Sequence, residues 1–524
     1  MAPAAALSAA PPVMVEPSAG VPVPPAQADG AQVSTSDDAE AGSMAVLQWI
    51  RWDPLPPFDL DELNAHPLRA RAARLLALPG QESAAESLLR TLLRDAGAQA
   101  IDRLLLVEVL LRRGDAAGAL GWLQDAAQFP PGLRGRAATI QGQLLFERGE
   151  FAAARIWADQ ALAAAPGAWA VQVLNGLLLS AERRWDEAIL QYRRMLVRRP
   201  DLAGVRLTLA GLLAQNGRVV EGLQENVVAE LFANSAQAAG QVPVWDGRLA
   251  DGDQLLVVSA GAGIGDAIQM LRYLPALRAR APHARLALLT RAELVPLART
   301  MGVFDEIGAD IAPTEHRFCG QVSLAHLALF HLLEPSPAPT LDPYLGCDPE
   351  RVAAMRLALE ARLPTGAPGP LRVGLRWSGQ PGGFDALRSV PVDRLAPLFA
   401  VPGITWIALL EGGHRDRGLL ATGTLPALDL SEQLVDLVDT AALMLNLDLV
   451  ITVDTSLAHL SGALGVPTWM MARPDLDRWG NEERTALYSS MRVFRHPAQR
   501  LDWDHVVSGV VAALRQRVGA GRAG

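Results

Sequence analysis

The chain has 524 residues, half of them hydrophobic and 20% charged, which excludes a wholly disordered or fibrous protein. A net charge of −9 argues against a dedicated nucleic-acid binder, so no nucleic-acid partner is expected. All 47 basic residues are arginine, which we attribute to an alanine- and arginine-rich genome. No lysine is therefore available as a base, a Schiff-base former or a phosphate ligand. At about 150 residues per domain, the length predicts about three domains.

The composition of the N-terminal region indicates neither a folded domain nor a targeting segment. Residues 1–45 are rich in Ala, Pro and Ser and predict a disordered tail, and residues 46–66 are treated as a linker without a firm assignment. The first arginine is Arg51, so a secretory signal is not expected. No apolar run of about 20 residues occurs, so no transmembrane segment is expected. Cys319 and Cys347 fit neither a zinc motif nor a disulfide framework, and these features together predict a cytoplasmic protein.

Residues 67–235 show a helical pattern that repeats about every 34 residues. A turn residue recurs, and a small residue follows it five positions later. The turn residues are Gly80, Gly114, Gly149, Arg183 and Gly217, at intervals of 34, 35, 34 and 34 residues. The residues five positions later are Ala85, Ala119, Ala154, Ala188 and Gly222. Arg183 and Gly222 depart from the glycine and alanine of the pattern.

This period resembles that of the tetratricopeptide repeat. Each repeat is a pair of amphipathic helices that cannot bury its apolar face alone, so neighbouring pairs stack into an all-α solenoid. The small residue lets the paired helices approach closely. A helical bundle without repeats is the alternative.

After residue 235, strand-like runs alternate with helical stretches, which predicts parallel sheets covered by helices. A first series covers about 245–345 and a second about 366–515. We therefore expect an α/β region of two Rossmann-like lobes with a cleft between them.

A glycine loop follows the first strand and opens a helix. Its glycines are Gly261, Gly263 and Gly265, and Asp266 comes directly after them. A dinucleotide-binding Gly-x-Gly-x-x-Gly would require glycine at position 266, and the second strand ends without an acidic ribose ligand, so an NAD site is disfavoured. The loop instead allows the backbone to approach a substrate closely. Asp266 either caps its helix or accepts a proton from an incoming hydroxyl group.

A second candidate site begins where a buried strand ends at Val453. Asp454, Thr455 and Ser456 form a predicted N-cap and first turn, whose free backbone N–H groups suit an anion such as a diphosphate. His459 lies one turn further, where its ring reaches toward the same anion. The alternative is a capped helix with a buried structural histidine.

A third candidate site is the loop Arg376-Trp-Ser378-Gly379, followed by a Gly-rich stretch and Arg388. Arg376 or Arg388 can bind phosphate through two hydrogen bonds. The alternative for each is a structural or solvent-exposed arginine.

These motifs resemble those of the bacterial lipopolysaccharide heptosyltransferase family. The family's nucleotide-sugar motif is similar to Asp454-Thr-Ser-Leu-Ala-His459 followed by Gly-Ala-Leu-Gly-Val-Pro467. Its N-terminal motif is similar to Gly263-Ile-Gly-Asp266 with Tyr273-Leu-Pro-Ala-Leu277. The first strand and loop of its C-terminal lobe are similar to Arg376-Trp-Ser-Gly379. Val244-Trp-Asp-Gly247 and Tyr488-Ser-Ser-Met-Arg-Val-Phe-Arg495 resemble segments of bacterial proteins that fuse tetratricopeptide repeats to such a domain. The layout, over about residues 67–515, is also similar to that of protein O-GlcNAc transferases.

The resemblance implies a GT-B fold and an inverting, metal-independent glycosyltransferase that uses a nucleotide sugar and no cofactor. Asp266 would be the general base on the acceptor hydroxyl. The donor-binding residues implied are Arg376, Ser378, Gly379, Arg388, Asp454, Thr455, Ser456 and His459. Protein groups and the helix dipole would neutralise the leaving diphosphate. The repeats would recruit a protein or glycan acceptor along their concave face.

One departure from the family concerns the loop after Trp-Ser-Gly. Relatives commonly place a lysine there, whereas residues 380–389 contain none. Either Arg388, which is always protonated, takes over that charge, or the site is weakened. The alternative function is therefore a repeat scaffold with a weak or inactive transferase domain. The Asp-x-Asp strings at Asp251/Asp253 and Asp475/Asp477 are interpreted as surface loops rather than metal sites.

Overall fold

A computed structural model describes residues 63–521, except for positions 79, 96, 125–128, 235–241, 260–262, 313–316, 334–342, 364–370, 380–384, 412, 474–478, 481 and 498–499. The predicted tail, residues 1–45, and most of the predicted linker lie outside the described residues. Gly261 and the Asp475/Asp477 string also lie outside them.

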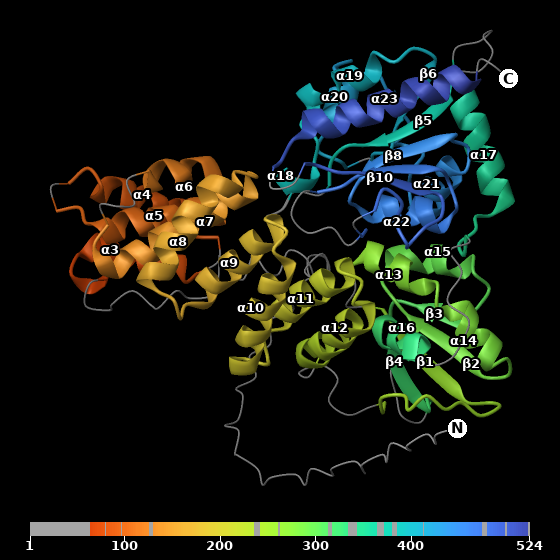
Figure 1. Cartoon of the computed structure of the whole chain (residues 1–524), viewed down its shortest axis with the longest axis horizontal. Helices are drawn as coiled ribbons and strands as arrows, with labels where there is room; N and C mark the ends of the chain where they lie inside the picture. The colour runs from red at the N-terminus through yellow and green to blue at the C-terminus, as the bar shows by residue number, and fades with distance from the viewer. Residues whose placement is uncertain are drawn as a thin grey trace, which may run out of the picture. The chain divides into compact units, whose positions relative to one another are not determined.

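The first part of the described chain consists of helices in which each packs against the next (Figure 1). They are α3 (Pro67–Leu76), α4 (Glu82–Leu92), α5 (Ala100–Arg112), α6 (Ala116–Leu123), α7 (Pro131–Glu147), α8 (Phe151–Ala164), α9 (Trp169–Ala181), α10 (Trp185–Arg198), α11 (Ala203–Gln215) and α12 (Val219–Asn234). The helical region predicted from the 34-residue period is confirmed.

The turn residues share one backbone conformation, which explains the period. Their φ angles are 76° at Gly80, 78° at Gly114, 75° at Gly149, 58° at Arg183 and 75° at Gly217. At the last four turns, the next residue donates its backbone N–H to a carbonyl five positions earlier: Asp115 to Leu110, Glu150 to Leu145, Arg184 to Leu179 and Arg218 to Leu213. This pattern ends a helix on a left-handed residue. Within the described residues, Arg183 is the only non-glycine residue with a positive φ.

The small residues five positions later lie where paired helices are closest. Ala85, Ala119, Ala154 and Ala188 are completely buried. At Gly222, an added Cβ would lie 2.7 Å from the Ala210 carbonyl oxygen, closer than real Cβ atoms come. Gly222 therefore allows close approach of the paired helices, as the alanines do, at a point where the helices are even closer.

A buried ion pair joins the first two repeats. The Arg69 guanidinium on α3 contacts the Asp102 carboxylate on α5 through bonds of 2.6 Å and 2.9 Å. The two side chains are 1% and 0% exposed. Asp102 also accepts the backbone N–H of Gln99 at 2.7 Å, which caps α5.

The first α/β lobe contains a four-stranded parallel sheet in the order β3-β2-β1-β4. Its strands are β1 (Gln254–Val258), β2 (Arg285–Leu289), β3 (Glu306–Gly308) and β4 (Gly320–Ser323). Its helices are α13 (Ile264–Leu271), α14 (Leu274–Arg280), α15 (Val295–Arg299) and α16 (Leu324–Leu333). The chain runs outward from β1 through β2 and β3 and then returns beside β1 as β4. The strand order therefore reverses at β1.

The second lobe contains a six-stranded parallel sheet in the order β10-β9-β8-β5-β6-β7. Its strands are β5 (Leu371–Arg376), β6 (Ile404–Ala408), β7 (Leu428–Asp429), β8 (Leu449–Val453), β9 (Thr468–Met471) and β10 (Met491–Phe494). Its helices are α18 (Asp385–Arg388), α19 (Ala396–Phe399), α20 (Arg417–Ala421), α21 (Leu437–Met444), α22 (Ser456–Ala463) and α23 (Trp503–Gly521). The order reverses between β5 and β8. The prediction of helical repeats followed by two parallel-sheet lobes is confirmed.

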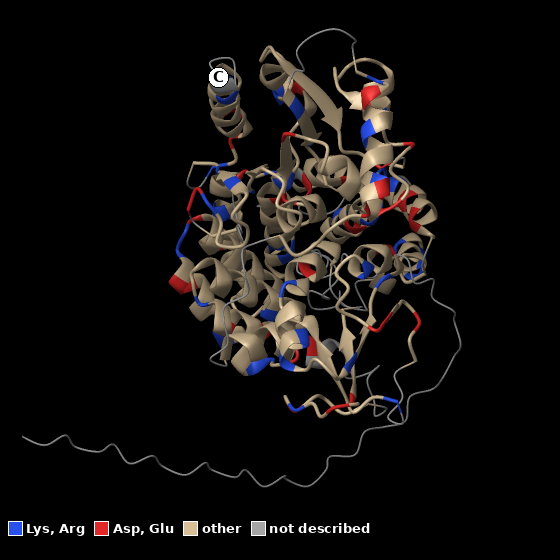
Figure 2. Cartoon of the chain, turned by 90° about the vertical axis from the view of Figure 1, so that its right-hand side faces the viewer, with Lys and Arg blue, Asp and Glu red and all other residues tan. Residues whose placement is uncertain are grey.

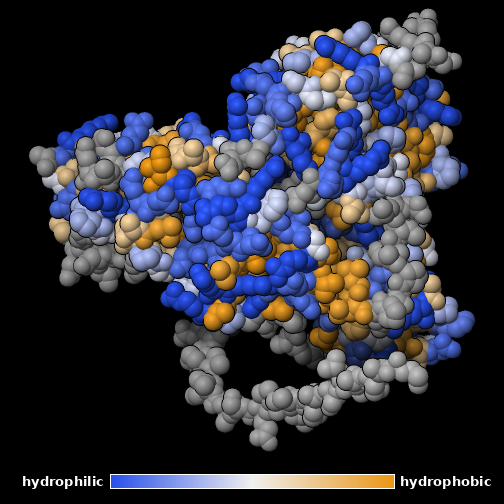
Figure 3. Space-filling model, in the orientation of Figure 1, coloured by the Kyte–Doolittle hydropathy of each residue, from blue (hydrophilic) through white to orange (hydrophobic). Residues whose placement is uncertain are grey.

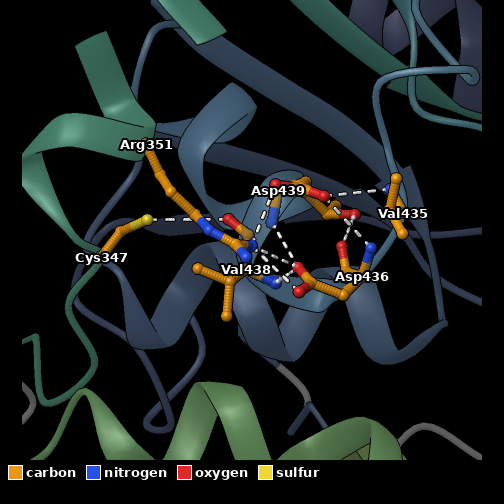
Figure 4. A network of polar contacts seen from close by, with 7 residues as sticks. Cys347, Arg351, Val435, Asp436, Val438 and Asp439 are labelled. Carbon is orange, nitrogen blue, oxygen red and sulfur yellow. Dashed lines mark hydrogen bonds and ion pairs between the residues drawn. The ribbon is translucent and has the colours of Figure 1, made fainter. Parts of the chain in front are cut away.

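Helix α17 (Pro349–Glu360) follows the first lobe in the chain but packs against α21 of the second. The Arg351 guanidinium lies 2.9 Å from Asp436 and 3.0 Å from Asp439 (Figure 4). Asp436 caps α21 by accepting the backbone N–H groups of Val438 and Asp439. Burial raises the pKa of Asp436, but these backbone donors and Arg351 outweigh it and hold the pKa below its ordinary value.

Buried apolar side chains form a core that both lobes share. One cluster includes Leu271 of α13 together with Leu457 and Leu460 of α22. A second cluster fills the opposite face of the six-stranded sheet, beneath α23. The last repeat helix, α12, packs on α16 of the first lobe, and Figure 3 shows hydrophobic residues gathered where these two helices lie.

The described helices carry charged residues of both signs (Figure 2). Figure 2 shows basic and acidic residues interspersed along the ribbons rather than collected in one basic patch. Among the helices that the structure describes, none is both long enough and apolar enough to cross a membrane.

Candidate active site

Three predicted segments follow strands at which the sheet order reverses. The glycine loop follows β1, and the segments that begin with Trp377 and Asp454 follow β5 and β8. Open α/β sheets bind ligands outside the carboxyl ends of their strands, at such reversal points. The topology therefore supports a ligand site near these loops without reference to any motif.

Gly265 brings the two lobes together. It is the second residue of α13, and an added Cβ would lie 2.8 Å from His459 Cδ2 and 3.4 Å from Ser456 Cα. No residue with a side chain fits this contact unless the neighbours move. Gly263, the N-cap of α13, has an ordinary φ of −60°. The close approach expected of the glycine loop thus occurs at Gly265, and it is made to the other lobe.

Asp266 follows Gly265 and is the third residue of α13. Its side chain is half-buried. Because Gly265 contacts His459 and Ser456, the structure brings the Asp266 segment and the 454–459 motif into one neighbourhood. Asp266 thus lies in the first turn of α13, at the end of the helix that carries the partial positive charge.

The start of α22 offers uncapped backbone N–H groups. Thr455 is the N-cap residue, with an extended φ of −140°, and within the described residues its side chain makes no capping hydrogen bond. Asp454, Thr455 and Ser456 are half-buried. The Asp454 carboxylate instead accepts the indole N–H of Trp479 at 3.1 Å. An uncapped helix start of this kind suits an anion.

His459 is buried and held on two sides by aromatic rings. It is 3% exposed, and its Nδ1 lies 3.0 Å from Tyr488 Oη. Its ring stacks on Trp479, with centroids 4.5 Å apart. Gly462 makes room for Tyr488, because a Cβ at that position would lie 2.4 Å from the tyrosine ring. The remaining ring edge, Cδ2 and Nε2, faces Gly265.

Arg376 is buried and bonded to the protein. Its Nε donates to the Ser378 carbonyl at 2.7 Å, and its Nη1 donates to the Leu409 carbonyl at 3.0 Å and to Glu411 at 2.7 Å. The Ser378 hydroxyl donates to Asp416. These contacts fix the loop after β5 against the loop after β6.

Arg388 lies over Gly379. A Cβ on Gly379 would lie 2.5 Å from Arg388 Nε, so any other residue here would displace the guanidinium. The Gly379 N–H donates to Ser389 Oγ at 3.0 Å, and Ser389 in turn donates to Asp385. Arg388 therefore lies against Gly379, directly before residues 380–384, which are outside the described part of the chain.

Sequence reasoning missed several residues that form this neighbourhood. Trp479 and Tyr488 orient His459, and Glu411, His414 and Asp416 lie beside the loop after β5. Burial, followed by nearby Arg376, lowers the pKa of His414. The available signal was position: the Glu411–Asp416 segment follows β6, a strand next to the reversal point.

The described residues contain no group of three or more His, Cys, Asp or Glu side chains arranged to hold a metal ion. Asp253, from one Asp-x-Asp string, accepts the backbone N–H of Ala250 at 2.7 Å and so closes a surface turn.

Comparisons with known proteins gave one curated relative and several solved structures. No protein-family model matches the chain. Similar structures include a glycosyl transferase family 9 protein from Veillonella parvula (13% identity, TM-score 0.40, covering 52% of this chain and 98% of that one) and the ADP-heptose lps heptosyltransferase II of E. coli (14%, 0.36, 51% and 99%). MamA AMB-1 is similar at 24% identity and a TM-score of 0.28, covering 32% of this chain and 99% of that one. Protein FlbA from Caulobacter vibrioides is 26% identical over 409 residues, which are 71% of this chain and 66%, just under two thirds, of that relative.

Proposed function

We propose that the chain is a glycosyltransferase that transfers a sugar from a nucleotide sugar to a protein or glycan acceptor, with inversion and without a metal ion. The observation that carries the proposal is the contact of Gly265 with His459 and Ser456. This contact joins the helix that bears Asp266 to an uncapped helix start on the other lobe. Sugar transfer needs a base and a diphosphate site on either side of one anomeric carbon.

Asp266 is the general base in this proposal. Its carboxylate takes the proton of the acceptor hydroxyl while the hydroxyl oxygen attacks the anomeric carbon. The bond from that carbon to the diphosphate oxygen breaks, and the diphosphate leaves with the electron pair. Attack from the face opposite the leaving group inverts the configuration.

The start of α22 neutralises the leaving diphosphate. Its backbone N–H groups, the hydroxyls of Thr455 and Ser456 and the ring of His459 supply hydrogen-bond donors in a water-poor site. Arg388 supplies the positive charge. We assign Arg376 a different part, because Ser378, Leu409 and Glu411 already engage its Nε and Nη1. Arg376 holds the loop of Ser378 and Gly379 in the shape that receives the donor.

The helical repeats recruit the acceptor. Their concave face is the surface on which such solenoids bind extended partners. The last repeat helix, α12, packs on α16 of the lobe that carries Asp266. Glu230 on α12 is half-buried, the loss of solvent raises its pKa, and its side chain bonds to Ser323 at the end of β4. A bound acceptor would therefore be presented from the base side of the site.

The test is a thermal-shift panel of ADP-heptose, UDP-GlcNAc and GDP-mannose, followed by a measurement of nucleoside diphosphate release. A bound donor raises the melting temperature by mass action. Asp266→Asn should lower turnover by a factor of about 100 or more while donor binding persists, since only the base is lost. His459→Ala should weaken donor binding. EDTA should change neither turnover nor donor binding.

Asp504→Asn is the matched control, because Asp504 also lies in the first turn of a helix, α23, but is 66% exposed and pairs with Arg394. It should leave binding and turnover unchanged. Equal turnover in the Asp266→Asn variant and the native chain would refute the assignment of the base.

The second candidate function is a repeat scaffold with an inactive transferase domain, favoured by the absence of lysine and by the Arg376–Glu411 ion pair. In that case donors bind without release of nucleoside diphosphate. Arg388→Lys separates the two, because it restores the residue type of the relatives, and a gain in turnover would show that the native site is degenerate.

A further inference from the structure

Two tyrosine hydroxyl groups link His459 to the first lobe through hydrogen bonds. Tyr488 Oη lies 3.0 Å from His459 Nδ1 and 3.5 Å from Tyr344 Oη. Tyr344 donates its own hydroxyl proton to the Ile268 carbonyl on α13 at 2.8 Å. The Arg272 guanidinium lies over the rings of both tyrosines, 4.8 Å and 5.4 Å from their centroids. The series of hydrogen bonds therefore ends on the helix that carries the proposed base.

The protons in this network can be assigned. Each tyrosine hydroxyl has one proton to donate. Tyr344 donates its proton to the Ile268 carbonyl, so it can only accept from Tyr488. The Tyr488 proton then has two acceptors, His459 Nδ1 at 3.0 Å and Tyr344 Oη at 3.5 Å. The second distance is beyond the ordinary range of about 2.5–3.0 Å for bonds between hydroxyl groups. The nearer atom, His459 Nδ1, is therefore the better acceptor for the Tyr488 proton.

Burial supports this assignment. It raises the pKa of Tyr488 well above the ordinary value, so the phenol keeps its proton at every pH relevant to the folded chain. The ring of His459 cannot turn away from the hydroxyl, because Trp479 stacks on it with a centroid separation of 4.5 Å.

We infer that Tyr488 is a positioning residue that fixes His459 as the neutral tautomer with its proton on Nε2. The ring then presents an N–H donor toward the start of α22 and toward Gly265, whose Cβ position lies 3.5 Å from Nε2. The identity of the ligand that accepts from this donor, the diphosphate of a nucleotide, rests on the proposed function. The assignment of the tautomer does not depend on it. An imidazole fixed in this way binds an anion at neutral pH without having to be protonated.

The charged and titratable groups around His459 are few within the described residues. Asp266 lies on α13, Arg272 directly follows that helix, Asp454 precedes α22, and the phenols of Tyr344 and Tyr488 lie nearby. Asp454 is engaged by the Trp479 indole N–H, and Arg272 donates to the Leu487 carbonyl at 2.8 Å. A fixed tautomer supplies the N–H group without any change in the charge of the ring.

The first test reads the tautomer directly. Nitrogen-15 NMR of histidine-labelled full chain should show His459 protonated on Nε2 and bare on Nδ1. Tyr488→Phe keeps the ring packing and should give a mixture of tautomers. Tyr344→Phe should leave the tautomer unchanged, as should the control Tyr192→Phe, which removes a buried hydroxyl from α10. Protonation on Nδ1 in the native chain, or an unchanged tautomer in Tyr488→Phe, would overturn the inference.

The second test uses ADP and UDP as probes from pH 6 to 8.5. Native affinity should vary little, whereas Tyr488→Phe should bind about tenfold more weakly at pH 8 and recover toward pH 6, where the ring becomes an imidazolium that donates from both nitrogens. A loss that is equal at every pH would indicate a merely structural role and refute the positioning role. If the native chain binds neither nucleotide, the proposed function loses its support, while the NMR result still decides the tautomer.

Discussion

Replacing Gly265 with alanine adds one methyl group at the contact between the lobes. The new Cβ would lie 2.8 Å from His459 Cδ2 and 3.5 Å from its Nε2. Ordinary carbon–carbon contacts are about 3.5–4.0 Å. The imidazole ring, the start of α22 or the start of α13 must therefore move by about 0.7–1.2 Å.

The effect of that movement on activity should be far larger than its effect on stability. A misplacement of about 1 Å in a catalytic arrangement can lower the rate by about 100-fold. Overpacking costs about 1–3 kcal/mol, but alanine in place of a helical glycine returns up to about 1 kcal/mol of helix propensity. The net loss of stability should therefore be about 2 kcal/mol or less, small enough for the lobes to stay folded.

The assay is the rate of nucleoside diphosphate release from whichever donor shifts the melting temperature, measured beside the melting temperature itself. Gly121→Ala is the matched control, because Gly121 lies in α6 and an added Cβ there meets nothing within 4 Å. It should gain helix propensity and keep its activity. A Gly265→Ala chain as active as the native one would refute the idea that this contact aligns the base with the donor site.

Arg183→Gly should stabilise the repeats by about 1 kcal/mol. Arg183 has a φ of 58°, a left-handed conformation that costs a residue with a side chain about 1 kcal/mol more than it costs glycine. A rise in melting temperature would check this prediction. Arg69→Met leaves the buried Asp102 carboxylate without its cation and should cost about 3–5 kcal/mol in urea unfolding, most of which the double change Arg69→Met with Asp102→Leu should restore. The pKa of Asp436 is lowered in the folded chain, so the stability from its pairing with Arg351 is present above about pH 4 and is lost as the pH falls through the folded pKa. The difference in melting temperature between the native chain and Arg351→Ala should accordingly shrink below about pH 4, and a constant difference from pH 7 to pH 3 would contradict this linkage.

The repeats could be predicted from sequence because their signals are local. A left-handed turn residue and a small residue five positions later act within one helical pair, so both recur at the same spacing in every repeat. Arg183 departs from the glycine pattern in sequence, yet it takes the same conformation as Gly149 and Gly217. The neighbouring repeats over-determine that turn, which is why one poor residue does not break the period.

The two lobes were also predictable, since strand and helix signals alternate over both. The contacts within the candidate site were not. Tyr488 lies 29 residues from His459 and carries no pattern that links the two. Likewise, no pattern links Arg376 to Glu411, which meets it only because β5 and β6 are neighbours. Periodicity reports an element and its buried face, whereas the partner of a polar side chain is set by the tertiary fold.

The electrostatics of the proposed reaction explain why two helix starts lie in one neighbourhood. The reaction brings together a carboxylate base and a diphosphate, which repel each other. Each anion has a helix start of its own, α13 for Asp266 and α22 for the diphosphate, so each gains a partial positive charge that needs no side chain. The repulsion falls as the base takes up a proton and the diphosphate departs. In a chain without lysine, the proposed site draws its stabilisation of the diphosphate from backbone N–H groups, a neutral imidazole and Arg388.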